Sequence, residues 1–216
     1  MEEYFAVMKG KTVTAFPLLG DTRNPFDSLK KADLTILDDG KAHLIVTSPP
    51  YGDHQTTVAY GQFSRHPSLW LELPEDVMYE VDRVGLGGRS KKDSREFNSP
   101  LLDSTIKTIK KIDPKRAEDV HAYFYDLDIC FERISSLLKQ GESHCCFVVA
   151  NRTVRRVKIP TDKIIVELAL KYGFKYKETI YRTIANKVMA TRNAPENIRD
   201  LPGETMTKES IVIWEF

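Results

Sequence analysis

The sequence lacks the features that mark a membrane, disulfide-bonded or zinc-binding protein. Its 216 residues contain no apolar run long enough to cross a bilayer and no secretory leader. There are only three cysteines, with no Cys-x-x-Cys pair and no His-x-x-x-His spacing, so we expect neither a metal site nor a disulfide framework. We interpret Cys130, Cys145 and Cys146 as reduced core residues. The chain has one domain's length, and we expect it in the cytoplasm.

A strong net charge is also missing. The chain carries 32 basic and 31 acidic residues, which give a formal charge of +1. Such a balance is unusual for a protein that binds nucleic acid only through a broad electrostatic field. The basic residues are nevertheless unevenly distributed, because the most basic stretch lies between residues 83 and 116.

A short apolar segment leads directly into four stiff residues. Residues 44–47 are followed by Ser48-Pro49-Pro50-Tyr51. The two prolines fix φ and have no N–H to donate, and a residue before proline is held extended. The carbonyls of Ser48 and Pro49 should therefore stay free to accept hydrogen bonds, with the flat ring of Tyr51 beside them. This arrangement suits a planar heterocycle with an exocyclic amine; the alternative is a proline turn that closes a buried strand.

Strands and helices alternate along the chain. We predict strands over 12–19, 42–48, 144–150, 175–184 and 209–216. We predict helices over 26–36, near 69–73, over 117–139 and from Thr161 or Asp162 to Tyr172, with a turn at 38–40 and helix-ending glycines at 141 and 173. This alternation favours an α/β sheet with helices on both faces, which binds ligands at the carboxyl ends of its strands. Ser48 lies at such an end.

Residues 47–51 resemble motif IV of the amino-DNA methyltransferases, in the Ser-Pro-Pro-Tyr form typical of cytosine-N4 enzymes. Upstream, residues 19–23 (Leu-Gly-Asp-Thr-Arg) resemble the Gly-Asp-Ser-Arg element that precedes motif IV. Downstream, residues 52–70 resemble one subgroup, and the likeness extends more loosely to the C-terminus. The resemblance implies a Rossmann-like, S-adenosyl-L-methionine-dependent fold. It also implies a prokaryotic, nucleoid-associated enzyme of the restriction-modification type.

The family's chemistry implies methyl transfer from S-adenosyl-L-methionine to cytosine N4 in duplex DNA after base flipping. Ser48, Pro49, Pro50 and Tyr51 are the predicted catalytic residues. The Ser48 hydroxyl and the Pro49 carbonyl would accept from the target amine, and Tyr51 would stack on the base. Asp21 and Ser48 are the predicted cofactor contacts, with Asp21 accepting from the cofactor's adenine amine. The alternative for Asp21 is a turn or helix cap.

Two groups of polar residues are predicted to contact DNA. The predicted contacts are His54, Gln55, Tyr60, Gln62, Arg65, Arg89, Lys91, Lys92, Arg152, Arg155 and Arg156. Those up to Arg65 follow the motif and would cover the flipped base or touch DNA. The others would bind phosphates, which positions DNA without reading its sequence. The alternatives are a solvated loop and a solvated charged face. Residues 186–197 resemble, loosely, a family loop beside the base pocket.

A glycine-rich turn of the Phe-x-Gly-x-Gly type, through which the backbone of such enzymes approaches the cofactor, is absent. The only dense glycine cluster, residues 85–88, follows a weak strand and precedes a poor helix start. We therefore expect a catalytic half-domain over 1–51 and 117–216, an insertion over 52–116 that contacts DNA, and an incomplete sheet without its first β-α units. Strand 42–48 would then be an open edge, a liability that soluble proteins cover.

A second polypeptide that carries the glycine loop is expected to pair with this edge, giving a heterodimeric, split enzyme that is active only with its partner. A decayed remnant and a self-associating fragment are the alternatives. Three other functions are also consistent with the motif. They are an adenine-N6 DNA methyltransferase, an RNA guanine-N2 methyltransferase and a non-catalytic DNA-recognition subunit. Ser48 disfavours the first two, which usually carry an acidic residue or Asn there, and the intact motif argues against the third.

Overall fold

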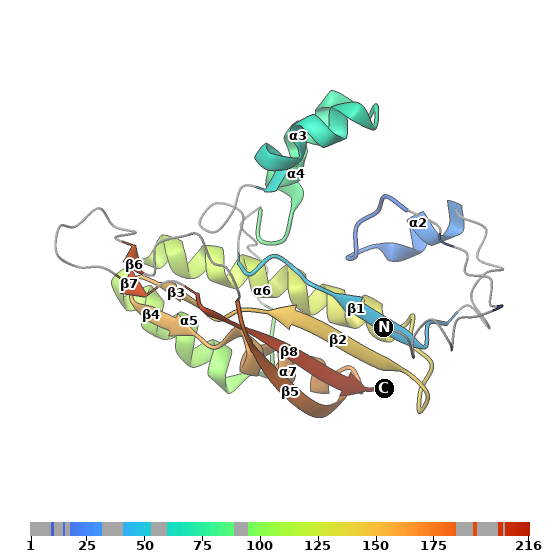
Figure 1. Ribbon diagram of the computed structural model, residues 1–216. Helices are drawn as coiled ribbons and strands as arrows, with labels where there is room; N and C mark the ends of the chain where they lie inside the picture. The colour runs from blue at the N-terminus through green and yellow to red at the C-terminus, as the bar shows by residue number, and fades with distance from the viewer. Residues whose placement is uncertain are drawn as a thin grey trace.

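The computed structural model describes residues 10, 15, 18–31, 41–52, 60–88, 95–184, 192–193, 203–204 and 206–216. The described helices are α2 (Pro25–Lys31), α3 (Tyr60–Trp70), α4 (Glu75–Val84), α5 (Pro100–Ile112), α6 (Pro114–Ser135) and α7 (Thr161–Leu170). The described strands are β1 (Leu44–Thr47), β2 (His144–Val149), β3 (Arg152–Val154), β4 (Val157–Ile159), β5 (Lys175–Thr183), β6 (Arg192–Asn193), β7 (Gly203–Glu204) and β8 (Lys208–Glu215). The chain is therefore a mixed α/β protein (Figure 1).

The main sheet has the strand order β1-β2-β8-β5. β1 pairs with β2 in parallel, whereas β8 runs antiparallel to both β2 and β5. The predicted strands 42–48, 144–150, 175–184 and 209–216 are thus confirmed. The sheet is thus mixed, which the apolar run at 144–150 does not reveal, because such a run does not indicate the direction of its neighbours. Among the described strands, β1 lies at one edge of the sheet.

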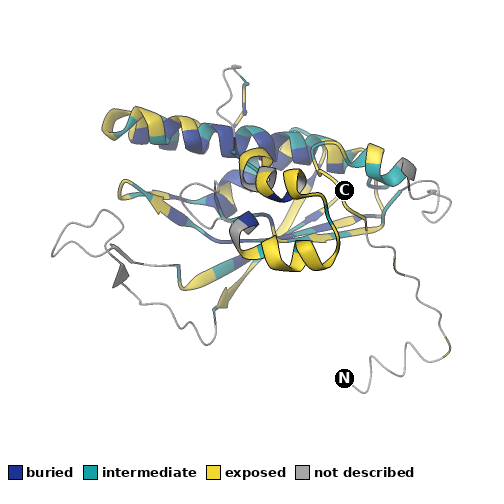
Figure 2. Cartoon of the chain, turned by 90° about the horizontal axis from the view of Figure 1, so that it is seen from above, coloured by how far each residue is buried: buried dark blue, intermediate teal, exposed yellow. Residues whose placement is uncertain are grey.

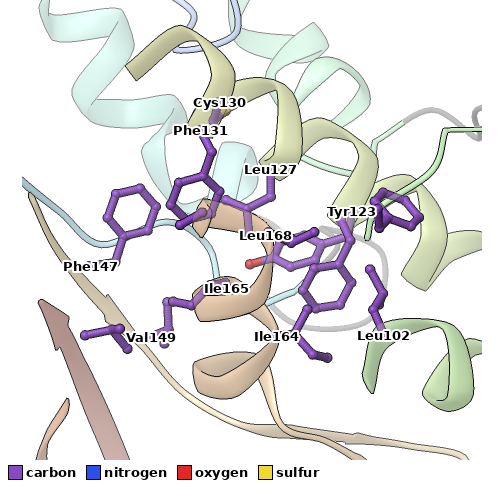
Figure 3. Close-up of a cluster of buried hydrophobic side chains, with 14 of the residues drawn as sticks. Leu102, Tyr123, Leu127, Cys130, Phe131, Phe147, Val149, Ile164, Ile165 and Leu168 are labelled. Atoms are coloured by element: carbon purple, nitrogen blue, oxygen red, sulfur yellow. The ribbon is translucent and has the colours of Figure 1, made fainter. Parts of the chain in front are cut away.

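One face of the sheet packs against helices and forms the core. Alternate residues of β2 and β8, among them Phe147 and Trp214, are fully buried there. Phe131 of α6 stacks on Phe147 with ring centroids 4.9 Å apart (Figure 3), and it meets the Trp214 ring edge-on at 5.7 Å. Such aromatic pairs stabilise a core beyond the area that they bury. This packing fixes α6 beside the carboxyl end of β1.

The other face of the sheet is largely exposed in the part of the chain that the structure describes. Leu44 and Val46 of β1 are 59% and 66% exposed, and nearly all of β5 is exposed. Figure 2 shows that the long helix α6 lies on one side of the sheet. The expectation of helices on both faces is therefore not met by the described helices. Sequence alternation predicts that helices exist, but it does not determine which face each one covers.

The longest helix, α6, covers most of the predicted 117–139 but begins at Pro114, where Asp113 caps it by accepting from the Arg116 N–H at 3.1 Å. The predicted end of this helix at Gly141 is wrong, because α6 ends at Ser135 with Ser136 as its C-cap, and Gly141 lies in a later turn with positive φ. Gly173, also with positive φ, follows the end of α7 as predicted. The predicted cap of α7 is wrong. Its N-cap is Pro160, with no side-chain hydrogen bond, and Asp162 instead accepts from the buried Ser210 hydroxyl.

α3 and α4 pack on each other and project away from the sheet (Figure 1). We call these two helices, residues 60–84, the arm. The helix predicted near 69–73 is wrong, because α3 starts before Pro67 and ends at Trp70, and Glu72 has a φ of 53°. A proline usually marks the boundary of a helix, so the sequence does not indicate that α3 continues through Pro67. α2 matches the start of the helix predicted over 26–36.

α5 belongs to the core although it falls within the predicted insertion. Its Leu102 and Ile109 are fully buried, and it packs along α6. The division of the chain at residues 52–116 stays a prediction. The predicted strand 12–19 and turn 38–40 lie almost wholly outside the described residues. None of the described helices is both long and apolar enough to span a bilayer.

Candidate functional site

A cavity of about 640 Å³ opens at the carboxyl end of β1. Three segments of the chain form most of its wall: residues 19–23, 47–50 and 84–86. The other lining residues are Leu127, Cys130 and Ile134 of α6, Phe147 of β2 and Asp76 of α4. Small-molecule sites usually enclose roughly 300–1,000 Å³. The motif and the upstream Gly-Asp element, which are separated in sequence, therefore meet at one cavity of ligand size.

Ser48 presents acceptors to this cavity. Its hydroxyl donates to the Val148 carbonyl on the neighbouring strand at 3.2 Å. A serine hydroxyl has one proton and two lone pairs, so this bond leaves it only acceptor capacity. Pro49 is buried, and its carbonyl accepts no hydrogen bond from the described residues. Ser48 and Pro49, whose oxygens are predicted to accept from the target amine, thus both lie in the cavity wall at the end of β1.

The second proline of the motif, Pro50, is held by a residue of α6. The Tyr123 hydroxyl donates to the Pro50 carbonyl at 2.6 Å, and the Arg152 guanidinium lies over the Tyr123 ring at 5.6 Å. Arg152 also lies against Gly52, where an added Cβ would come within 2.2 Å of its Nη1. A side chain at residue 52 would therefore force the Arg152 side chain to move. Sequence reasoning did not find Tyr123, because its helical spacing resembles that of any core residue.

Tyr51 is oriented by the far strands of the sheet. Its hydroxyl donates to Glu209 Oε1 at 2.5 Å, and Arg182 donates to Glu209 Oε2 at 2.9 Å. The Tyr51 hydrogen bond, followed by that from Arg182, holds the pKa of the Glu209 carboxyl below its usual range. A charged acceptor at this place fixes the ring of Tyr51 at the end of the motif. No signal in the sequence links Glu209 and Arg182 to the motif.

Asp21 forms a turn, which is the structural alternative left open by the sequence, and it also lies in the cavity wall. Its carbonyl accepts from the Asn24 N–H at 2.8 Å, which makes the turn, and the residue lines the cavity. The carboxylate also accepts from the Arg23 guanidinium at 2.6 Å. This hydrogen bond, opposed by burial and supported by Asp126, raises the pKa of Arg23 above its already high value. About half of the Asp21 side chain is exposed, so it can still accept from a ligand.

The glycine cluster 85–88 was not expected to serve a cofactor, yet the structure places Gly85 and Leu86 in the cavity wall. Gly87 has a φ of 71°, and a Cβ there would lie 3.0 Å from the Tyr123 Cα. Its N–H donates to the Asp126 carboxylate of α6 at 2.9 Å. The cluster therefore allows a loop to approach α6 closely where the two border the cavity.

Two buried thiols near the site are protonated at neutral pH. Burial raises the pKa of Cys130, which lines the cavity, to about 12, and that of Cys145 also to about 12. A protonated thiol is a poor nucleophile. Among the described residues, no three His, Cys, Asp or Glu side chains group in a way that would hold a metal ion.

The structure separates the predicted DNA contacts. His54, Gln55, Arg89, Lys91 and Lys92 lie outside the described residues, as does most of the 186–197 loop. Tyr60 and Gln62 belong to the first turn of α3, in the arm, where Arg65 lies over the Tyr79 ring at 5.0 Å.

The predicted contacts after β2 differ from one another in exposure. Arg152 is only 5% exposed, which favours support of the motif over contact with a phosphate. Arg155 and Arg156 form the exposed tip of the β3–β4 hairpin, both with positive φ. Arg155 pairs there with Asp113 at 2.9 Å.

No family model matches the chain. The chain is 43% identical over 179 residues to the type II methyltransferase M.MvaI of Kocuria varians. The match covers 79% of this chain and 39% of that protein, so the chain spans well under half of its relative's length. The sequence is thus similar to part of a methyltransferase.

Solved structures give weaker matches. A protein of Thermus thermophilus assigned as a DNA modification methylase aligns with a TM-score of 0.44 at 18% identity, over 91% of this chain and 52% of that one. Its complex with S-adenosyl-L-methionine aligns at 0.43 and 17% identity, over 91% and 53%. Likeness at this level does not decide the fold, which rests on the strand order described above.

Proposed function

We propose that this chain forms part of a site-specific DNA methyltransferase that moves a methyl group from S-adenosyl-L-methionine to cytosine N4 in duplex DNA. One observation carries the proposal: Ser48 and Pro49 line the same cavity as Asp21. A target amine and a methyl donor must meet in one place, and this cavity offers a contact for each. The 43% identity to a type II methyltransferase supports the reaction class.

The cavity fits the proposed cofactor in size, polarity and charge. Its wall is apolar at Leu86, Leu127 and Ile134, while Asp21 and Asp76 contribute carboxylates. S-adenosyl-L-methionine carries a positive sulfonium and an ammonium, which these carboxylates complement. The Asp21 carboxylate, which is about half exposed, would accept from the adenine amine. When bound, the cofactor supplies an electrophilic methyl group.

Ser48 and Pro49 would activate the target amine by accepting its protons. Cytosine N4 is a poor nucleophile because its lone pair is conjugated with the ring. Hydrogen bonds from the amine to the Ser48 hydroxyl oxygen and the Pro49 carbonyl favour a tetrahedral nitrogen and localise that lone pair. Since the Ser48 proton is already donated to Val148, the hydroxyl accepts rather than donates. Fixed acceptors of this kind accelerate a reaction by positioning and preorganised dipoles.

Tyr51 would stack on the flipped base. Stacking of a base on an aromatic ring contributes about 1–3 kcal/mol, on the scale of the cost of unstacking it from the duplex. The hydrogen bond from Tyr51 to Glu209 holds the phenol in one orientation before the base arrives. Arg155 and Arg156 at the hairpin tip and Arg65 on the arm are proposed to contact the DNA, together with the predicted residues outside the described part.

We further infer that a second polypeptide completes the sheet at β1. In the described part of the chain, no strand pairs with the outer edge of β1, and Leu44 and Val46 are largely exposed. Open apolar edges promote unwanted pairing and are normally covered. A strand followed by a glycine-rich turn would cover this edge and bring backbone N–H groups to the cofactor. Another segment of the same, longer polypeptide is the competing source.

The test uses the chain together with whatever binds it. The chain is purified from its host as bait, its partners are identified by mass spectrometry, and the preparation is incubated with labelled S-adenosyl-L-methionine. Label in duplex DNA but not in tRNA supports the proposal, and label in neither would favour a binding module. Calorimetry of the isolated chain should show weak or no binding of S-adenosyl-L-methionine; tight one-to-one binding would contradict the need for a second polypeptide.

A further inference from the structure

Asp126 on α6 joins two walls of the cavity that are far apart in sequence. Its side chain is 1% exposed. It accepts from the Gly87 N–H at 2.9 Å and lies 3.1 Å from Nη1 of Arg23. Gly87 belongs to the loop that follows the arm, and Arg23 belongs to the segment that carries Asp21. A buried carboxylate is stable only with such partners, and removing one of them is costly.

Arg23 extends this connection to the end of the arm. Besides Asp21 and Asp126, its guanidinium donates to the carbonyl of Val84, the last residue of α4. The last carbonyls of a helix have no partner within the helix, and a cation there also complements the negative end of the helix dipole. Arg23 therefore caps α4 while holding the carboxylate of α6. Its planar fork of five N–H donors can serve these three partners at once.

We propose that Arg23 and Asp126 form a positioning pair that fixes the arm to the cavity wall. The arm ends at Val84, and residues 84–86 and Asp76 of α4 line the cavity. A shift of the arm would therefore change the shape of the cavity. The pair opposes such a shift by holding the end of the arm and the loop after it against α6. The pair is a property of the folded chain. Its consequence, that DNA on the arm and methyl donor in the cavity influence each other's binding, rests on the proposed function.

Hydrogen exchange of the full chain tests the pair without cofactor or DNA. In Asp126→Asn and in Arg23→Gln, the amides of residues 84–88 should exchange about ten- to a hundredfold faster, as expected when a hydrogen bond to a charged group is lost. The amides of β2 and α7 should keep their wild-type rates. In the double variant the effect should be smaller than the sum of the two single effects, because Arg23 and Asp126 also hold each other, although each has its own contact with residues 84–88.

Asp119→Asn is the matched control, since Asp119 is also a carboxylate of α6 paired with an arginine, Arg116, at 2.9 Å, but does not line the cavity. It should leave residues 84–88 unchanged. Wild-type exchange at 84–88 in both Asp126→Asn and Arg23→Gln would overturn the proposal, and so would additive effects in the double variant. Arg23→Gln keeps the test informative if the buried Asp126→Asn fails to fold. Absence of methyltransferase activity would contradict the proposed function but would not change the hydrogen-exchange result.

Discussion

The phenol of Tyr123 donates a hydrogen bond to the carbonyl of Pro50 over 2.6 Å, which ties the middle of α6 to the Ser48–Tyr51 motif. Tyr123 is 1% exposed and packs edge-on against Phe124. The helix that contributes most to the core thus also fixes the backbone of the motif. With Ser48 bound to β2 and Tyr51 bound to β8, three of the four motif residues are anchored to three different elements of the fold.

Tyr123→Phe should lower the free energy of unfolding by about 1–3 kcal/mol, because the Pro50 carbonyl loses its partner in a part-buried place. Denaturant unfolding measures the change. Tyr176→Phe is the matched control, since it also removes a phenol hydrogen bond, to Thr179, but at the surface. Equal stability losses in the two variants would contradict the structural role of Tyr123.

Ser48→Ala should reduce methyl transfer by about 10²–10³-fold, the loss typical of one preorganised hydrogen-bonding group in an active site. The variant should still fold, because Ser48 is exposed and makes a single weak hydrogen bond. The rate is measured with labelled cofactor under single-turnover conditions on the complete assembly. Ser104→Ala, an exposed serine of α5, is the control and should keep the wild-type rate. A Ser48→Ala rate close to wild type would remove Ser48 from the mechanism.

Acidification should weaken the anchor of Tyr51. Hydrogen bonds from Tyr51 and Arg182 hold the pKa of Glu209 below its ordinary value of 4.5. A carboxyl whose pKa is lower in the folded state stabilises the fold above its unfolded pKa, and this stability disappears as the pH falls through the folded pKa. The stability difference between wild type and Glu209→Gln should therefore be full at neutral pH and shrink below pH 4.5.

Denaturant unfolding at a series of pH values between neutral and acidic conditions measures that difference. Glu118→Gln, which neutralises an exposed glutamate of α6, is the charge-matched control. A difference between wild type and Glu209→Gln that stays constant across the acidic range would show that Glu209 is not coupled to Tyr51 and Arg182 as described.

Val46→Lys should reduce recovery of a partner that covers β1. The side chain of Val46 is 66% exposed, so the substitution should cost little stability in the chain alone. It should nevertheless place a charge in the proposed interface, where burying an unpaired charge is costly. Co-purification is the measurement, and Leu170→Lys, at a 54% exposed position on α7, is the control. Undiminished recovery with Val46→Lys would place the partner elsewhere.

Local pattern was sufficient for the elements with strong periodicity or clear breakers. Most of the helix predicted over 117–139, the strand that delivers Ser48, and the glycine stop at 173 follow from side-chain spacing and from the conformational freedom of glycine. The helix predicted near 69–73 was misplaced because Pro67 lies inside α3. Local pattern does not say when a helix tolerates a proline.

The site was only partly predictable for a related reason. Ser48-Pro49-Pro50-Tyr51 and Asp21 are recognisable because a stiff motif and its spacing are local features of the sequence. Their supports come from distant residues such as Tyr123, Asp126 and Glu209, whose roles depend on how elements pack. A buried aspartate on a helix has no signature in the sequence until its partners are known. The direction of β8, which places Glu209 beside Tyr51, was equally invisible.

The most direct test of the central claim is the identity of the methylated nucleoside. DNA treated with the complete assembly and S-adenosyl-L-methionine is digested to nucleosides and analysed by mass spectrometry, with the Ser48→Ala assembly in parallel. The account predicts N4-methyldeoxycytidine with the wild-type chain and a loss of about 10²-fold or more with the variant. N6-methyldeoxyadenosine as the product would contradict the assignment of the target base, and unmodified DNA would contradict the proposed enzyme itself.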